Sequence, residues 1–191
     1  MENFIEKLKG VITLSAEAEA YLYSISEEKS IPKGVTLIRE GQTVKKIYFV
    51  HEGCMRSFCT DKNGKEHTLQ FAIKNWWISD YIAIHNHEKA TLSIETLSAS
   101  AIIEFKAKEL IGIHSEFPEF EAYQRNNLER HIVSLHKRIL NQLQLTAEER
   151  YDLFLEQYPN IEQSARNYHI ASYLGITQQS LSRIRVEKAK K

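Results

Sequence analysis

Residues 167–184 read NYHIASYLGITQQSLSRI, and their pattern predicts the architecture at the C-terminal end of the chain. Ala171 is small where two helices would approach closely, and Gly175 stands where a tight turn needs left-handed backbone. Apolar side chains at the intervening positions would close a small core around the turn: Ile170, Leu174, Ile176, Leu181 and Ile184. The spacing therefore predicts a helix-turn-helix whose second helix is capped by Thr177.

The polar side chains of this second helix suit the major groove of DNA. Glutamine amides pair with adenine edges and arginine with guanine edges, while hydroxyl and cationic groups contact phosphates. The predicted DNA contacts are Ser172, Thr177, Gln178, Gln179, Ser180, Ser182, Arg183, Arg185 and Lys188. The sequence thus predicts a surface that reads double-stranded DNA.

The charge distribution supports a polyanionic partner at the same end. The 191 residues contain 25 basic and 25 acidic side chains, so the formal net charge is zero. Residues 163–191 nevertheless hold six basic side chains and one acidic side chain. An acidic body with a basic end is typical of a protein that meets nucleic acid through that end.

The middle of the chain has the pattern of a β-rich domain. After two short helices predicted within residues 4–25, short β-rich runs separated by glycines extend to Phe105. The Asn63-Gly64 pair between two of the runs is typical of a hairpin, because both residues accept positive φ. The predicted strands are Val35–Ile38, Ile47–Val50, Cys54–Thr60, His67–Phe71, Ser93–Leu97 and Ala101–Phe105. They predict a sandwich or barrel.

A long helix is predicted from about Glu109 to Gln144. Leu128, Ile132, Leu135 and Ile139 follow one another at steps of four and three, with polar residues on both sides. This narrow apolar stripe would either pack on its own domain or form a dimer seam with a second copy, and we favour the seam. A capping-box pattern at residues 146–149 then begins another helix.

On residues 170–177 and 180–185, the chain resembles the Crp/Fnr family of bacterial transcription factors. The resemblance extends to the β-rich region and the long helix. It implies an α+β fold with a cyclic-nucleotide-binding-like β-roll (a jelly roll) at residues 1–115, a dimerisation helix at 116–145 and a winged helix-turn-helix at 146–191. It also implies a cytoplasmic homodimer on a near-palindromic operator, with Arg183 reading bases and RNA polymerase as a further partner.

The effector pocket departs from the family pattern. Cyclic-nucleotide-binding members carry a Gly-Glu-Leu step followed by a Pro-Arg pair, whereas here Ser79 and Asp80 replace the Gly-Glu and Glu88 and Lys89 replace the Pro-Arg. Lysine lacks the fork of arginine, and a neighbouring glutamate repels phosphate. The pocket is predicted at Trp77, Ser79, Asp80, Lys89, Ala90 and Thr91. We therefore expect a small-molecule effector other than a cyclic nucleotide, or none, and Trp76 and Trp77 could also pack the β-roll against the long helix.

Other functional classes have weaker sequence support. Two cysteines without zinc-site spacing predict free thiols, and we expect neither a metal site nor an iron–sulfur cluster. Haem ligation by a histidine stays open for His51, His67, His85 and His87. No catalytic or membrane-spanning motif is found, so we expect neither an enzyme nor a membrane partner. The alternatives are a metal-binding barrel enzyme, suggested by residues 85–88, and a ligand-sensing β-roll that acts through a protein partner.

Overall fold

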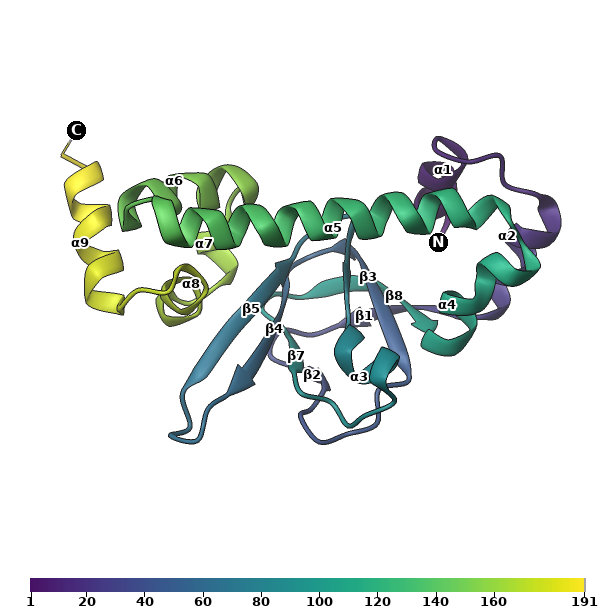
Figure 1. Cartoon of the computed structure of the whole chain (residues 1–191), viewed down its shortest axis with the longest axis horizontal. Coiled ribbons are helices and arrows are strands. Elements are labelled where there is room, and N and C mark those ends of the chain that lie inside the picture. Colours follow the sequence, from purple (N-terminus) through teal and green to yellow (C-terminus); the bar gives the residue numbers. More distant parts are fainter. Residues whose placement is uncertain (191) are drawn as a thin grey trace.

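The computed structural model describes residues 1–190, and Lys191 of the predicted helix-turn-helix region lies outside the described residues. Two antiparallel sheets form a β-roll, the long helix α5 runs across it, and further helices gather at both ends of α5 (Figure 1). The helices are α1 (Glu2–Lys9), α2 (Ala16–Ser24), α3 (Tyr81–Asn86), α4 (Ala107–Glu116), α5 (Glu119–Gln144), α6 (Ala147–Gln157), α7 (Ile161–Ser164), α8 (Asn167–Leu174) and α9 (Gln178–Lys188). The strands are β1 (Ser26–Ile31), β2 (Thr36–Ile38), β3 (Lys46–Glu52), β4 (Met55–Thr60), β5 (Glu66–Ala72), β6 (Trp76–Ile78), β7 (Ser93–Thr96) and β8 (Ser100–Lys106).

The two sheets have the strand orders β1-β8-β3-β6 and β2-β7-β4-β5. Their inward faces bury an aliphatic core that includes Val50, Met55, Ile78, Ile94 and Ile102. The predicted hairpin joins β4 and β5, where Gly64 has a φ of +77°. All six predicted strands are confirmed within a few residues. Only some of them alternate between buried and more exposed residues, as β7 does, whereas β3, β4 and β8 are buried over four consecutive residues.

The two predicted N-terminal helices are confirmed and cover the outer face of the first sheet. The Ser15 hydroxyl caps α2 by accepting a hydrogen bond from the backbone N–H of Ala18 at 3.2 Å. The Phe4 ring of α1 lies 4.8 Å from the Phe49 ring and 5.6 Å from the Trp77 ring, centroid to centroid. This aromatic contact ties the N-terminus to the β-roll.

Helix α5 leaves its apolar stripe uncovered. Its 26 residues contain one buried residue, Phe120. The exposed fractions of Leu128, Ile132, Leu135 and Ile139 are 57%, 51%, 40% and 57%, so nothing within residues 1–190 covers the predicted seam. The stripe is therefore a large apolar surface on a helix that is otherwise polar.

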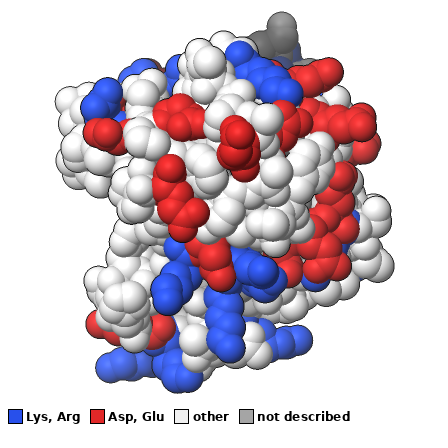
Figure 2. All heavy atoms as spheres, turned by 90° about the vertical axis from the view of Figure 1, so that its right-hand side faces the viewer, with Lys and Arg blue, Asp and Glu red and all other residues white. Residues whose placement is uncertain are grey.

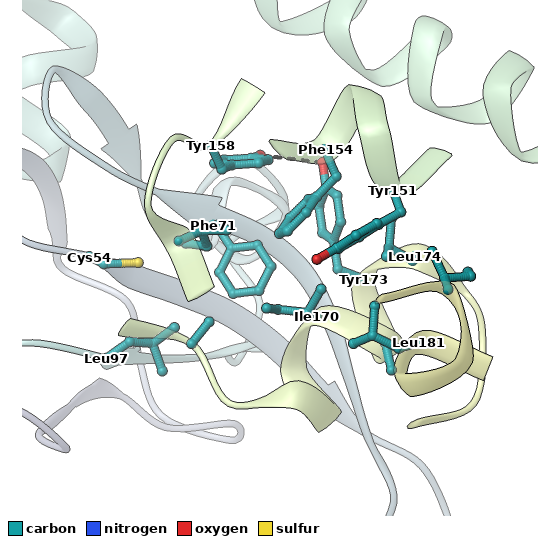
Figure 3. Packing of buried hydrophobic residues seen from close by; sticks show 14 residues of the cluster. Cys54, Phe71, Leu97, Tyr151, Phe154, Tyr158, Ile170, Tyr173, Leu174 and Leu181 are labelled. Atoms are coloured by element: carbon teal, nitrogen blue, oxygen red, sulfur yellow. Dashed lines mark hydrogen bonds between the residues drawn. The ribbon is translucent and has the colours of Figure 1, made fainter. Parts of the chain in front are cut away.

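A shared core joins the C-terminal helices to the β-roll. Figure 3 shows Phe71 of β5 facing Phe154, Tyr158 and Tyr173 of α6–α8, and the ring centroids lie 5.3–5.8 Å from that of Phe71. Cys54 lies at the edge of this cluster, and burial raises the pKa of its thiol to about 12. The packing thus crosses the domain boundary that we predicted at residues 145/146.

The structure differs from the predicted winged helix-turn-helix in one respect. Residues 146–190 form α6–α9 and add no strand to either sheet, so the described chain has no wing. Asn160 adopts a left-handed conformation (φ +63°) and leads directly into the short helix α7. This leaves no pair of extended segments that could form a hairpin between α6 and α8.

Candidate DNA-binding surface and sensor cavity

The predicted turn between α8 and α9 is confirmed by its backbone. Gly175 ends α8 in the left-handed region (φ +70°, ψ +34°), where an L side chain is strained. A Cβ atom at this position would also lie 3.0 Å from Oε1 of Gln142 in α5. The Thr177 hydroxyl then caps α9 by accepting a hydrogen bond from the backbone N–H of Ser180 at 3.1 Å.

The first turns of α9 present polar side chains to solvent. Leu181 and Ile184 point into the shared core and hold the helix in place. Thr177, Gln178, Gln179, Ser182 and Arg183 are exposed, and Ser180 is half-buried. Because α9 lies at the far end of the molecule from α1 and α2 (Figure 1), this face is open for a large partner.

Two of the predicted phosphate contacts are occupied within the chain, which corrects the sequence analysis. Arg185 donates to the Tyr151 hydroxyl (2.9 Å) and to Oδ1 of Asn167 (2.6 Å), and it pairs with Glu162. Lys188 likewise forms an ion pair with Asp152. These cations neutralise carboxylates of α6 and α7 and hold α9 against those helices.

Ser172 is also not free to contact a phosphate, because it joins α8 to the β-roll. Its hydroxyl accepts a hydrogen bond from the backbone N–H of Thr68 (2.9 Å) and donates to the carbonyl oxygen of Glu66 (3.1 Å), both in β5. From α5, Arg138 bonds the carbonyl oxygen of Leu69, and its guanidinium lies 4.2 Å from the Tyr173 ring centroid. Strand β5, α5 and α8 thus form one connected unit, which we call the β5–α8 junction.

A buried arginine beneath this junction was missed by the sequence analysis. The Arg56 side chain is 1% exposed; its Nε donates to Oε1 of Glu95 at 2.7 Å, and the guanidinium also pairs with Glu66. It lies 4.0 Å from the centroid of the Phe58 ring and 5.8 Å from that of Tyr168 in α8. A buried charge needs such partners, so Arg56 fixes the position of the β4–β5 hairpin under α8. Arg56 is the one charged residue in β4 (Met55–Thr60), and this was the signal available in the sequence.

His169 of α8 is buried beside the same arginine. Its exposed fraction is 3%, and neither ring nitrogen has a hydrogen-bond partner within residues 1–190. Burial, together with the positive charges of Arg56 and Arg166, lowers the pKa of His169 to about 3. The ring is therefore neutral in the folded chain at physiological pH.

Acid should destabilise the folded chain through His169. Its folded pKa of about 3 lies below the value of about 6.5 for an unfolded histidine, so the unfolded chain binds more protons between these values. The free energy of unfolding should fall by up to about 1.4 kcal/mol per pH unit from about pH 6 to pH 4. Urea denaturation at a series of pH values measures this slope. H169F should reduce it, and equal slopes in the two proteins would contradict the assignment.

The predicted effector residue Asp80 has a structural role instead. Its carboxylate is fully buried and caps α3 by accepting a hydrogen bond from the backbone N–H of Ala83 (3.1 Å). It also accepts from the backbone N–H groups of Thr91 (2.7 Å) and Leu92 (2.9 Å) and from the Thr91 hydroxyl (3.1 Å). These four bonds leave no reason to assign Asp80 to a ligand.

The other predicted pocket residues are likewise dispersed. The Ser79 hydroxyl donates to the carbonyl oxygen of Lys46 (2.7 Å), and Nζ of Lys89 donates to the Thr43 hydroxyl (2.8 Å). Trp77 packs in the aromatic cluster around α1, and Ala90 is buried in the aliphatic core. Asp80 and Thr91 bond each other, whereas Trp77, Ser79, Lys89 and Ala90 contact other parts of the β-roll. The pocket predicted at Trp77, Ser79, Asp80, Lys89, Ala90 and Thr91 stays a prediction, and these contacts do not support it.

A small cavity does lie between the β-roll and α5. Its volume is about 190 Å³, and its lining includes Trp76, Ser79, Leu135, Arg138 and Tyr173. This is below the roughly 300 Å³ at which ligand sites begin. The lining contains one arginine, Arg138, which bonds the carbonyl oxygen of Leu69, and it contains no carboxylate. The carboxylate that binds the ribose in the family pattern is therefore missing from this cavity. Trp76 lines it in place of Trp77, because adjacent strand residues face opposite sides.

No group of three or more His, Cys, Asp or Glu side chains within residues 1–190 is placed to hold a metal ion. No helix within the same range combines the length and the apolar character needed to cross a membrane.

Comparison with known proteins agrees with this architecture. The family described as "Cyclic nucleotide-binding domain" matches residues 28–116. The fumarate and nitrate reduction regulatory protein of Escherichia coli is 24% identical over 172 residues, which cover 84% of this chain and 68% of that protein. FixK2 from Bradyrhizobium japonicum has a TM-score of 0.75 at 17% identity, covering 87% and 85% of the two chains. A transcriptional regulator of the Crp/Fnr family from Eubacterium rectale has a TM-score of 0.72 at 15% identity, covering 93% and 85%.

Proposed function

We propose that the chain is a DNA-binding transcriptional regulator of the Crp/Fnr type that acts as a homodimer on a near-palindromic operator, and its similarity to regulators of this kind supports the proposal. The observation that carries the proposal is the exposed polar face of α9, which begins at the Thr177 cap after the left-handed turn at Gly175. Each copy would insert α9 into one of two successive major grooves, about one helical turn apart.

Within α9, the exposed side chains have separate roles in the proposal. Arg183 reads guanine, and Gln178 and Gln179 read adenine edges, because these groups match the donor and acceptor patterns of the bases. Thr177, Ser180 and Ser182 set the register through phosphates. Arg185, Lys188 and Ser172 are left out, since their polar groups bind other helices or strand β5. The hydroxyls of Thr177 and Ser180 bond each other within the exposed first turn of α9 and stay in the proposal.

The dimer of the proposal forms along α5. Leu128, Ile132, Leu135 and Ile139 form a stripe with the spacing of a two-helix seam, and a second copy of the same stripe would cover it. Pairing of two α5 helices sets the distance between the two α9 helices. Dimerisation and operator binding are therefore linked in the proposed mechanism.

The β5–α8 junction supplies the route by which the β-roll would influence DNA binding. A small-molecule effector that binds one arrangement of the β-roll better than another would shift the position of α8 through Ser172 and Arg138. In this proposal the protein acts in the cytoplasm, contacts RNA polymerase and carries out no catalysis. The alternative, a β-roll that acts through a protein partner in place of DNA, predicts no operator.

Selection of the purified protein against a random duplex library at near-physiological salt tests the proposed function. We expect enrichment of an inverted repeat with half-sites about one helical turn apart. Repeated selections without an enriched motif, together with capture of a protein that tolerates changes in Gln178, Gln179 and Arg183, would favour the alternative.

Replacing Arg183 by alanine should weaken binding to the selected operator by about 1–3 kcal/mol and relax the base preference at one position of each half-site. The side chain is exposed and Leu181 and Ile184 hold the helix without it, so the fold should not change. Fluorescence anisotropy on cognate and scrambled duplexes measures the effect. R39A removes an exposed arginine from the β-roll and is the matched control. Equal losses in the two variants would contradict base reading by Arg183.

A further inference from the structure

A lysine-lined cleft lies on the β-roll, at the end of the molecule opposite α9. It has a volume of about 1110 Å³ and is bordered by β3, β8, α3 and α4. Its basic residues are Lys45, Lys46, Lys89, Lys106, Lys108, His85 and His87, and its acidic residues are Glu88 and Glu109. Figure 2 shows this end of the molecule, with Lys and Arg gathered in the lower part of the view and mostly Asp and Glu above them.

The fold holds two of these lysines in a costly arrangement. Lys46 of β3 lies directly opposite Lys106 of β8 in the antiparallel register, and like charges at such positions repel each other. Glu104 compensates only in part, because its Oε1 is shared between Lys46 (2.8 Å) and Lys29 (3.1 Å). Within residues 1–190, no carboxylate lies within ion-pair distance of Lys45, Lys106 or Lys108. The positive charge of the cleft is therefore only partly neutralised, by Glu104 at Lys46 and by Glu88 and Glu109 of the lining.

The start of α4 adds to this field. The ten-residue helix begins at Ala107 with Lys106 as its N-cap residue; its first turn contains Lys108 and Glu109, and no side chain caps it. Helix N-termini are usually accompanied by acidic residues, because the helix dipole is positive there. Here Lys106 and Lys108 outnumber the one acidic residue, Glu109, so the potential at the start of α4 stays positive, which favours an anion in the cleft.

The floor of the cleft is apolar. Val44, Ala83, Ile84, Ala107 and Ile111 line it between the lysines. A volume of about 1110 Å³ exceeds what one phosphate needs and is within the range of nucleotide-sized ligands. The occupant that satisfies both features carries several negative charges and a ring that covers apolar surface.

We propose that this cleft binds a small polyanion in which two or more phosphates are joined to a planar ring, as in a nucleoside di- or triphosphate. The phosphates lie against Lys106 and Lys108, and the ring covers Val44 and Ile84. This site is separate from the cavity between the β-roll and α5. It is also separate from the DNA-binding surface, because α4 and α9 lie at opposite ends of α5 (Figure 1).

Binding of N-methylanthraniloyl-ATP to the full chain, followed by fluorescence anisotropy at about 50 and 300 mM KCl, tests the site. Unlabelled ATP should displace the probe, tripolyphosphate should do so more weakly because it lacks a ring, and adenosine should not displace it. The double variant K106A/K108A should lose at least about tenfold in affinity, since it removes two charge-assisted contacts.

Two controls separate this site from general charge effects and from the DNA-binding surface. K62A/K65A removes two exposed lysines from the β4–β5 hairpin and should change the affinity less than about twofold, because that hairpin lies outside the cleft. R183A should also leave probe binding unchanged, so the result does not depend on the proposed function. Equal losses in K106A/K108A and K62A/K65A, displacement by adenosine as strong as by ATP, or no probe binding at the lower salt concentration would each overturn the proposal.

Discussion

Replacing Ile132 by glutamate should convert the proposed dimer to a monomer and lower its affinity for operator DNA by about a hundredfold or more. Ile132 is 51% exposed and lies in the middle of the seam on α5. In a pair of such helices the two glutamates would meet across an apolar interface, where like charges are desolvated and repel each other. A monomer holds one half-site only and loses the gain from binding two half-sites together.

Sedimentation equilibrium gives the oligomeric state of this variant, and anisotropy on the selected operator gives its affinity. N126E adds the same charge to an exposed position on another face of α5 and should remain dimeric with wild-type affinity. The circular dichroism spectrum of I132E should match that of the wild type, because the Ile132 side chain belongs to none of the three hydrophobic core clusters. A dimeric I132E variant with full operator affinity would show that the seam lies elsewhere.

The β-roll was predictable from sequence where its strands alternate between core and solvent, and less so where they do not. Strand β1 (Ser26–Ile31) has the polar sequence SEEKSI and lies at a sheet edge, so it shows no apolar alternation. Strand β6 has three residues, and α3 has six, which is too short for a helical period. Strands β1 and β6 depend on pairing with β8 and β3, which a local pattern does not contain. Helix α3 has a local cap, Asp80, but the cap alone does not predict so short a helix.

The candidate sites were also predictable from sequence where their contacts are local, and not where the contacts join distant parts of the chain. The helix-turn-helix was predictable because its turn, cap and core lie within eighteen consecutive residues. The internal partners of Ser172, Arg185 and Lys188 come from β5 and α6–α7, at distances along the chain that no local pattern records. The β5–α8 junction combines residues of β4, β5, α5 and α8, so folding was needed to bring them together. The resemblance to the Crp/Fnr family could place Asp80 in the pocket region. It could not show that backbone N–H groups of Thr91 and Leu92 donate hydrogen bonds to the Asp80 carboxylate.

Replacing Asp80 by alanine should lower the free energy of unfolding by about 3–5 kcal/mol, because the change removes a helix cap and leaves buried N–H groups without an acceptor. The affected donors are the backbone N–H groups of Ala83, Thr91 and Leu92. For a chain of this length the midpoint of thermal unfolding should fall by roughly 10 °C. Calorimetry of the ligand-free protein measures the change.

Asp61 provides the matched control for this prediction. Its carboxylate also accepts hydrogen bonds from two backbone N–H groups, those of Asn63 (2.8 Å) and Lys65 (3.0 Å), but it lies in the exposed β4–β5 hairpin. In D61A water can replace the lost acceptor, so the midpoint should change much less than in D80A. A D80A variant with wild-type stability and a lost response to a small molecule would instead return Asp80 to a ligand-binding role. The burial of its carboxylate argues for the structural outcome, since a ligand contact would need at least one oxygen free to face the ligand.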